Sequence, residues 1–175
     1  AMSVLTLLSN LNSHPKNYAE TDDTHSFWTL SDQHAEKSQK ISASLVNVFE
    51  KHKEPVLESE LMNFYNKSSS SIENIDPKAF WASVDLSKNI NKNIFGEVGP
   101  SSWAIIRPRG VKDKAYLVVK RDGKPKHFRE IAKMINTVSF SNRKANVQTV
   151  HNELIKDRRF VLVGRGTYGL TEWGY

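Results

Sequence analysis

The side chains with the clearest capacity for chemistry are cations and amides near the carboxyl end of the 175-residue chain. Gln and Asn side chains can hydrogen-bond the edge of adenine in a DNA groove, while Arg and Lys bind phosphates. Both kinds occur in one short stretch whose apolar residues have helical spacing. The sequence therefore predicts a nucleic-acid-binding surface made of Arg143, Lys144, Gln148, Thr149, Asn152, Lys156, Arg158, Arg159 and Arg165.

Charge is distributed unevenly along the chain, whose formal net charge is +6. Residues 1–37 hold 2 basic and 5 acidic residues, residues 38–108 hold 8 of each, and residues 109–175 hold 15 basic and 6 acidic residues. The last segment thus carries +9, which favours attraction to an acidic polymer or surface. An ordinary solvated basic face is the simpler alternative. Acidic residues at the corresponding part of the first repeat predict a protein-contact or spacer role there.

No pattern typical of catalysis or of a resident metal occurs in the sequence. Cysteine is absent, and the six histidines show no ligand spacing such as His-x-x-x-His. Nucleotide-binding fingerprints and the Gly-x-Ser-x-Gly nucleophile motif are also missing. We therefore expect no enzymatic activity, metal, cofactor or small-molecule substrate. No apolar run reaches roughly 18 residues, so we expect no membrane partner and a cytoplasmic location.

The elements that must hold the basic surface are predicted by an internal repeat. Two helical stripes of apolar residues come first in each copy, and Pro55 and Glu60 of the first copy recur as Pro125 and Glu130. In the first copy the stripes are Ile41, Leu45, Val48 and Phe49, then Leu57, Leu61, Phe64 and Tyr65. In the second copy they are Ala115, Val118 and Val119, then Phe128, Ile131 and Ile135.

A third helix is predicted in both copies. Asp76 followed by Pro77 has the residue types preferred at a helix N-cap and first position, and Ser141 or Asn142 is the expected cap in the second copy. The apolar residues assigned to these helices are Phe80, Val84 and Ile90 in the first copy, and Val147, Val150 and Leu154 in the second.

A hairpin is predicted to close each copy. Residues 95–105 align without gaps on residues 160–170 through the pattern Phe-x-x-Val-Gly-x-x-Ser/Thr-aromatic-x-aliphatic. This alignment pairs Trp103 with Tyr168, which we expect in the cores rather than as base-stacking platforms. Arg165 would stand at the second hairpin tip. Gly164 would take a turn angle that valine resists, so Gly164→Val should destabilise this copy.

The order helix, helix, helix, hairpin is that of a winged helix, with the third helix as recognition helix and the hairpin as wing. We therefore predict an α+β fold, mainly α, with tandem winged-helix modules at residues 38–108 and 109–175. Residues 1–37 are expected to hold a β-hairpin left from a preceding module, with strands at residues 4–8 and 27–30.

The stretch from Thr149 to Trp173, with its ending Phe-x-x-x-Gly-x-x-x-aromatic-Gly-Leu-x-x-Trp, resembles the HARE-HTH family of winged-helix domains. Residues 124–132 are similar to the second helix of that family, so the resemblance covers roughly residues 109–175. The family includes the N-terminal domain of the RNA polymerase delta subunit, and similar modules follow sigma-factor-like helix-turn-helix domains. The resemblance implies a role in transcription, but no sigma-like domain is present here.

Three functions remain open at this point. The basic third helix and wing favour contact with duplex DNA. The resemblance to the delta subunit favours a module that docks on RNA polymerase. An accessory domain of a nuclease or chromatin complex is compatible with the wider family.

Overall fold

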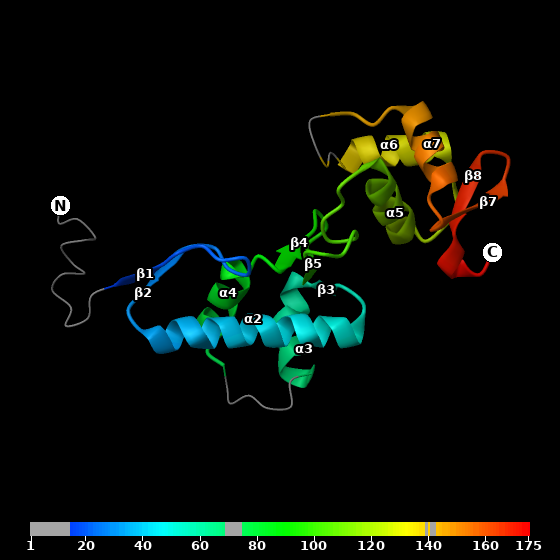
Figure 1. The fold of residues 1–175 in the computed structure, drawn as a ribbon. Coiled ribbons are helices and arrows are strands. Elements are labelled where there is room, and N and C mark those ends of the chain that lie inside the picture. Colours follow the sequence, from blue (N-terminus) through cyan, green and yellow to red (C-terminus); the bar gives the residue numbers. More distant parts are fainter. Residues whose placement is uncertain (1–14, 69–74, 139, 141–142) are drawn as a thin grey trace. The chain divides into compact units, whose positions relative to one another are not determined.

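The computed structural model describes residues 15–68, 75–138, 140 and 143–175. The fold is α+β, with six α-helices and small antiparallel sheets in this part of the chain (Figure 1). The chain divides into two compact units, residues 1–102 and residues 103–175. The boundary expected between residues 108 and 109 lies slightly beyond that division.

The first unit is built on a long helix, α2 (Asp32–His52), followed by β3 (Val56–Leu57), α3 (Glu58–Ser68), α4 (Pro77–Leu86), β4 (Ile90–Lys92) and β5 (Glu97–Pro100). The three strands form an antiparallel sheet in the order β3-β5-β4. The predicted stripes supply most of the core, whose largest fully buried side chains are Leu45 and Phe49 of α2, Leu61 and Tyr65 of α3, and Phe80 of α4. Leu57, which was predicted to begin the second helical stripe, lies instead in β3 and is 44% exposed.

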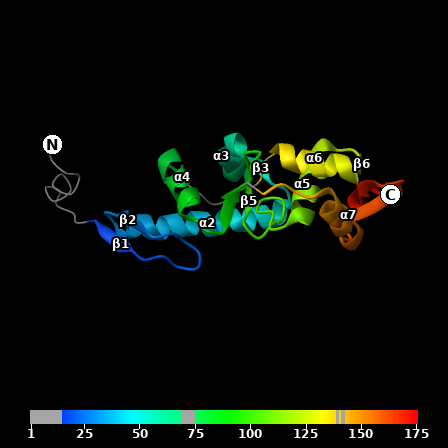
Figure 2. The same ribbon diagram turned by 90° about the horizontal axis from the view of Figure 1, so that it is seen from above.

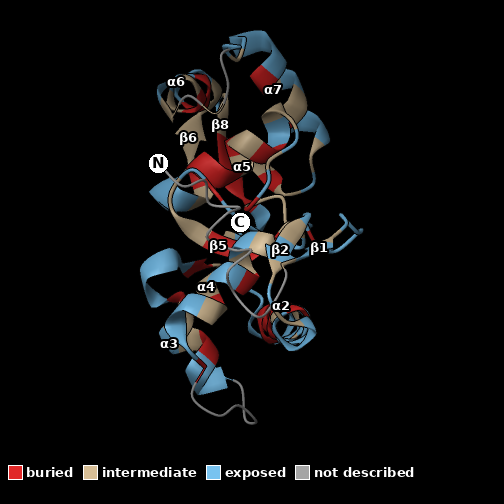
Figure 3. Ribbon diagram, turned by 90° about the vertical axis from the view of Figure 1, so that its left-hand side faces the viewer, coloured by how far each residue is buried: buried red, intermediate tan, exposed pale blue. Residues whose placement is uncertain are grey.

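The second unit has the same order of elements: α5 (Val111–Asp122), β6 (Lys126–His127), α6 (Phe128–Val138), α7 (Val147–Lys156), β7 (Phe160–Gly164) and β8 (Thr167–Leu170), with a short 3-10 turn at Thr171–Trp173. Its sheet has the order β6-β8-β7. Figure 3 shows buried turns on α5 and both buried and exposed faces on α7. The core unites Val119 of α5, Ile131 of α6, Leu154 of α7 and Leu170 of β8.

The two units repeat these elements at a constant offset along the chain. The third helices span Pro77–Leu86 and Val147–Lys156, and the second helices begin at Glu58 and Phe128. The first helices end at His52 and Asp122. Lys53 and Gly123 then both adopt the left-handed conformation, in which each backbone N–H reaches back to a carbonyl in the last helical turn.

This offset corrects the predicted alignment of the hairpins, which set Phe95 against Phe160. β5 and β8 are the equivalent strands, so Gly99 corresponds to Gly169 and Trp103 to Trp173. The first hairpin is formed by β4 and β5, and Trp103 lies beyond it. Ile90 accordingly begins a strand and does not belong to the third helix. The register is fixed by the pairing of β3 with β5, a contact that the hairpin sequences themselves do not encode.

The helix caps match the prediction in the first unit. Asp76 is the N-cap of α4 and accepts a hydrogen bond from the Ala79 N–H at 3.1 Å, with Pro77 at the first helical position. In the second unit the cap of α7 is Asn146, which accepts from the N–H groups of the second and third helical residues. The alternatives Ser141 and Asn142 lie outside the described residues.

The N-terminal hairpin consists of β1 (Lys16–Tyr18) and β2 (Phe27–Thr29), and Figure 2 shows it beside the N-terminal part of α2. The strand that pairs with Phe27–Thr29 is therefore Lys16–Tyr18, for which the sequence pattern had indicated a polar loop. The predicted strand at residues 4–8 lies outside the described residues. The expected boundary between residues 37 and 38 falls inside α2.

Backbone hydrogen bonds attach the hairpin to the first unit. The His25 N–H donates to the Leu86 carbonyl, and the Lys88 N–H donates to the Asp23 carbonyl, both at 2.9 Å. Thr24 and Ser87 form an isolated β-bridge between them. The hairpin is thus an extension of the first unit.

The turn of the second hairpin depends on Gly166. Gly166 has φ of +68°, whereas Gly164 is not in the left-handed region. A Cβ on Gly166 would also lie 2.7 Å from His127 Nε2, while one on Gly164 would make only ordinary contacts with Thr167. The strain that the sequence pattern predicted at Gly164 therefore belongs to Gly166.

Candidate nucleic-acid interface

Helix α7 presents an exposed face with several polar side chains, and Val147, the first residue of the predicted apolar stripe, is 40% exposed. Val150 and Leu154 are fully buried in the core, which turns the opposite side of the helix outward. Four of the predicted site residues are exposed there, namely Gln148, Thr149, Asn152 and Lys156. Gln148 Nε2 donates to Asn152 Oδ1 at 3.1 Å, so the two amides, one helical turn apart, are already oriented together.

Two predicted cations, Arg143 and Lys144, are exposed just before the N-cap of α7. The chain between them and the helix is anchored to α6, because Ala145 donates its N–H to Asn136 Oδ1 at 2.7 Å and accepts from Asn136 Nδ2 at 3.1 Å. This anchoring holds Lys144 close to the positive end of the helix dipole. Both features favour a negatively charged partner at this end of α7.

Arg165 is exposed in the turn between β7 and β8. That turn is tied to the start of α6, because the Phe128 N–H donates to the Gly166 carbonyl at 3.0 Å. The Phe128 ring in turn stacks on the His151 ring of α7, with centroids 4.2 Å apart and planes 20° apart. The hairpin turn and the middle of α7 are therefore linked through one aromatic contact.

Lys156, the last residue of α7, and Arg158, in the short segment between α7 and β7, are both exposed. The Arg158 carbonyl accepts a 2.8 Å hydrogen bond from Thr171 Oγ1, which fixes the backbone while leaving the side chain outside the core. Together with Arg165, these residues place cations at the C-terminal end of α7 and on the adjoining hairpin.

Arg159 differs from its neighbour, because its guanidinium is engaged inside the unit. Nη2 lies 2.5 Å from Asp157 Oδ2 and 2.7 Å from Asp113 Oδ1, and Cζ lies 4.8 Å from the centroid of the Tyr116 ring. The hydrogen bond from Arg159 lowers the pKa of the Asp157 carboxyl, against the opposing effect of burial. The same bond raises the pKa of Arg159 above its ordinary value.

This geometry corrects the role expected for Arg159. Its side chain is 30% exposed, and the two carboxylates are 11% and 12% exposed. A phosphate would have to compete with two carboxylates that are already in place. Arg159 therefore joins α5 to the start of β7 and is not part of the exposed cationic set.

Two exposed residues of the second unit were not assigned to the site by the sequence patterns. Ile155 on α7 is 63% exposed. Arg129 is exposed at the start of α6, with its guanidinium carbon 5.9 Å from the centroid of the Phe128 ring. Ile155 could have been noticed because it falls outside the stripe of Val150 and Leu154. The position of Arg129 follows only from the contact between α6 and the hairpin turn.

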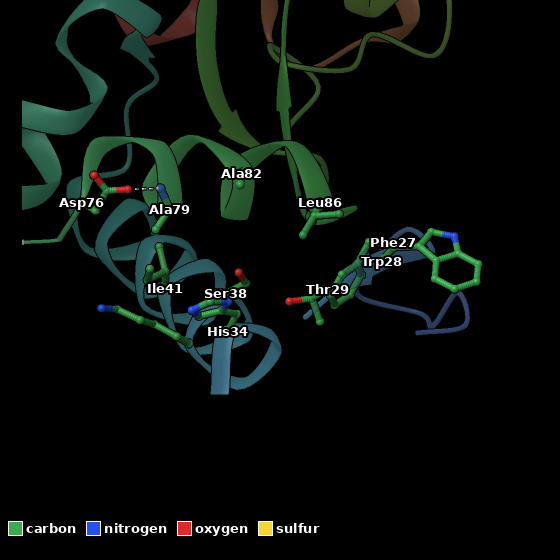
Figure 4. Close-up of a pocket in the computed structure, with 11 residues that line it drawn as sticks. Phe27, Trp28, Thr29, His34, Ser38, Ile41, Asp76, Ala79, Ala82 and Leu86 are labelled. Atoms are coloured by element: carbon green, nitrogen blue, oxygen red, sulfur yellow. Dashed lines mark hydrogen bonds between the residues drawn. The ribbon is translucent and has the colours of Figure 1, made fainter. Parts of the chain in front are cut away.

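The corresponding face of α4 in the first unit is different. By the constant offset between the units, Ala79 and Ala82 are equivalent to Thr149 and Asn152. In Figure 4 this face of α4 borders a cavity of about 320 Å³ whose other walls come from β2 and α2. The exposed indole of Trp28 lies on the β2 side. The central positions of this face in the first unit are therefore alanines, with the charged Lys78 and Asp85 exposed toward its two ends.

No family model, curated protein or solved structure matches the chain. The resemblance to the HARE-HTH family rests on the sequence motif alone. In the described ranges, no group of three or more His, Asp or Glu side chains could hold a metal ion. No helix within those same ranges is both long and apolar enough to cross a membrane.

Proposed function

We propose that this chain is a transcription-associated DNA-binding protein made of two winged-helix units, in which the second unit contacts the duplex. The observation that carries the proposal is the contrast between the two third helices. The exposed face of α7 carries two amides at its centre and has cations at both of its ends, whereas the matching face of α4 has alanines at the positions of Thr149 and Asn152 and is flanked by the N-terminal hairpin.

The winged-helix assignment is supported by the order of elements and by the sheet. In each unit the strand before the second helix pairs with the last strand of the hairpin, which holds the hairpin against the helices. An α-helix with its side chains is about 10–12 Å across, which fits a major groove about 12 Å wide. With α7 in the groove, Arg165 on the hairpin could reach the neighbouring backbone or minor groove.

The salt dependence of binding tests this proposal. The exposed cations of this surface are Arg129, Arg143, Lys144, Lys156, Arg158 and Arg165. With four to six phosphate contacts, the logarithm of the association constant should fall with the logarithm of salt concentration at a slope of about −4 to −5. Fluorescence anisotropy with a labelled duplex measures it.

Single substitutions sharpen the measurement. Lys144→Ala and Arg165→Ala should each weaken binding and reduce the slope by about 1. Lys67→Ala in α3 of the first unit removes the same charge from an exposed position outside the proposed interface, so it should leave the slope unchanged. A flat salt response in the parent chain would refute DNA binding.

Docking on RNA polymerase is the second candidate function, and one observation favours it. The hairpin of the second unit exposes apolar side chains, since Leu162 is 60% and Val163 is 37% exposed, and Tyr175, which follows the 3-10 turn after β8, is 61% exposed. The Tyr175 ring covers Gly169, because a Cβ on that glycine would lie 3.0 Å from Tyr175 Cε2. Tight binding to core polymerase in a pull-down, together with weak binding to any duplex, would favour this function over the first.

A further inference from the structure

We infer that the exposed face of α7 selects adenine–thymine base pairs in the major groove, through the Gln148 and Asn152 amides and the Ile155 side chain. This inference rests on the proposed function, because it specifies the duplex that the second unit binds. It depends on three features of the helix: the bonding within the amide pair, the exposed isoleucine, and the position of the cations.

The hydrogen bond between the two amides decides which groups remain for a base. Gln148 Nε2 donates one of its two N–H groups to Asn152 Oδ1, so the Gln148 Oε1 acceptor, the Asn152 Nδ2 donor and the second Gln148 N–H stay available on two exposed side chains. Adenine presents an N6 donor and an N7 acceptor in the major groove. The pair therefore matches adenine with one donor and one acceptor, in a geometry that is already formed before binding.

Guanine fits the same pair less well. Its major-groove edge carries two acceptors, O6 and N7. The Gln148 Oε1 atom, which is itself an acceptor, would therefore face an acceptor and form no hydrogen bond. A buried acceptor without a donor is unfavourable. The amide pair thus discriminates by leaving an unsatisfied group when the wrong purine is present.

Ile155 supplies an apolar contact beside the amides. It follows Asn152 by one helical turn on the exposed side of α7, and it is 63% exposed although Leu154 next to it is fully buried. Thymine is the base with a methyl group in the major groove, and apolar side chains contact that methyl. Burying Ile155 against thymine removes both groups from water.

The cations lie at the ends of this face and not in its centre. Lys156 is the single Lys or Arg of α7. Arg and Lys, which are the commonest readers of guanine, otherwise occur before the helix at Arg143 and Lys144 and after it at Arg158. Phosphate-binding groups at the edges and amide and aliphatic groups in the centre fit a helix that reads A·T pairs.

The corresponding positions of the first unit lack these groups. Lys78, Ala82 and Asp85 of α4 are equivalent to Gln148, Asn152 and Ile155 of α7 by the same offset. An amide pair and an exposed aliphatic side chain are therefore not required by the fold itself. Their presence on α7 is specific to the second unit.

The test compares three duplexes of equal length with identical ends, titrated with the full chain by fluorescence anisotropy at low salt. One has a mixed A·T centre, one has a G·C centre, and one has 7-deazaadenine in place of adenine. The last duplex keeps the Watson–Crick pairing and the minor groove but lacks the N7 acceptor. We expect the A·T duplex to bind about tenfold tighter than the G·C duplex, with the 7-deazaadenine duplex between them because it keeps the thymine methyl and the N6 donor.

Variants connect this preference to the named side chains. The double substitution Gln148→Ala with Asn152→Ala should reduce the A·T preference to the part that Ile155 contributes, while Arg165→Ala should weaken all three duplexes by a similar factor. Ile155→Ala should reduce the preference for thymine over uracil in an otherwise identical A·T duplex.

Three results would overturn the inference, and they differ in what else they overturn. If all three duplexes bind equally and with a steep salt dependence, the A·T selection is wrong and the DNA-binding proposal survives. If no duplex binds, both are wrong. An A·T preference that is undiminished with 7-deazaadenine, or in the double variant, would also overturn it, because the selection would then not arise from these amides.

Discussion

Replacing Arg159 by alanine should destabilise the second unit strongly while sparing DNA affinity. The substitution removes one guanidinium that joins Asp157 and Asp113, at 2.5 and 2.7 Å, and that lies over the Tyr116 ring. The two carboxylates are nearly buried, and alanine would leave them unpaired. Asp113 belongs to α5 and Asp157 directly follows α7. The substitution therefore removes a link between α5 and the segment after α7, which are distant in sequence.

The magnitude follows from the burial of the network. Removing one partner of a fully buried ion pair costs about 3 to 5 kcal/mol. Because the Arg159 side chain is 30% exposed, water can hydrate the unpaired carboxylates and reduce this cost. The lost contact with the Tyr116 ring increases the cost by about 0.5 to 1 kcal/mol. We expect a loss of about 3 kcal/mol in the free energy of unfolding, which is a large share of the stability of a small domain.

Hydrogen exchange of backbone amides in α5 and β7 measures this loss in the second unit alone. A loss of about 3 kcal/mol should accelerate exchange through global opening by roughly two orders of magnitude. Arg158→Ala is the matched control, since it removes an adjacent exposed arginine and should change stability by no more than about 0.5 kcal/mol.

The same two variants should have the opposite order of effects on DNA affinity. Arg158→Ala should weaken duplex affinity, and Arg159→Ala should preserve it under conditions where the unit stays folded. The reasoning is refuted if Arg159→Ala leaves exchange in α5 within about threefold of the parent chain. It is refuted equally if Arg159→Ala lowers affinity as much as Arg158→Ala does.

Three further predictions concern the second unit. Gly166→Ala should lower its stability by about 1 to 3 kcal/mol, because the residue has φ of +68° and the added Cβ would lie 2.7 Å from His127 Nε2, whereas Gly164→Ala should be nearly neutral in the same thermal melt. Asn146→Ala should cost about 1 kcal/mol in urea denaturation through loss of the α7 cap, and an unchanged midpoint would contradict the assignment. The lowered pKa of Asp157 means that its contribution to stability is present above its unfolded value of 3.8 and is lost as the pH falls through the lower folded value. Acid titration of the urea midpoint should therefore be steeper below about pH 4 in the parent chain than in Arg159→Ala, and parallel curves would contradict the ion pair.

Local patterns in the sequence determined much of the fold. The apolar stripes of the helices and the Asp76 cap depend on residues within one or two turns of each other, so periodicity and cap chemistry were sufficient to predict them. The exposed side of α7 followed in the same way from Val150 and Leu154, which is why Gln148 and Asn152 could be placed on the surface.

The hairpins show where local patterns were insufficient. The match of Pro55 with Pro125 already indicated the correct offset between the units, but the pattern of Phe, Val and Gly aligned equally well in a shifted register. Such a pattern is degenerate, because any short strand with a turn can satisfy it. The correct register came from a third strand, β3 or β6, that is separated from the hairpin by two helices.

The sequence by itself determined that cations are concentrated near the carboxyl end, and only the tertiary structure decided which of them remain exposed to a partner. Arg158 and Arg159 are adjacent and identical in type, yet one is exposed and the other is engaged by Asp113, 46 residues away. The physical reason is that the free energy of a charge depends on its burial and on its partners. Both are set by packing between segments that are remote in the sequence.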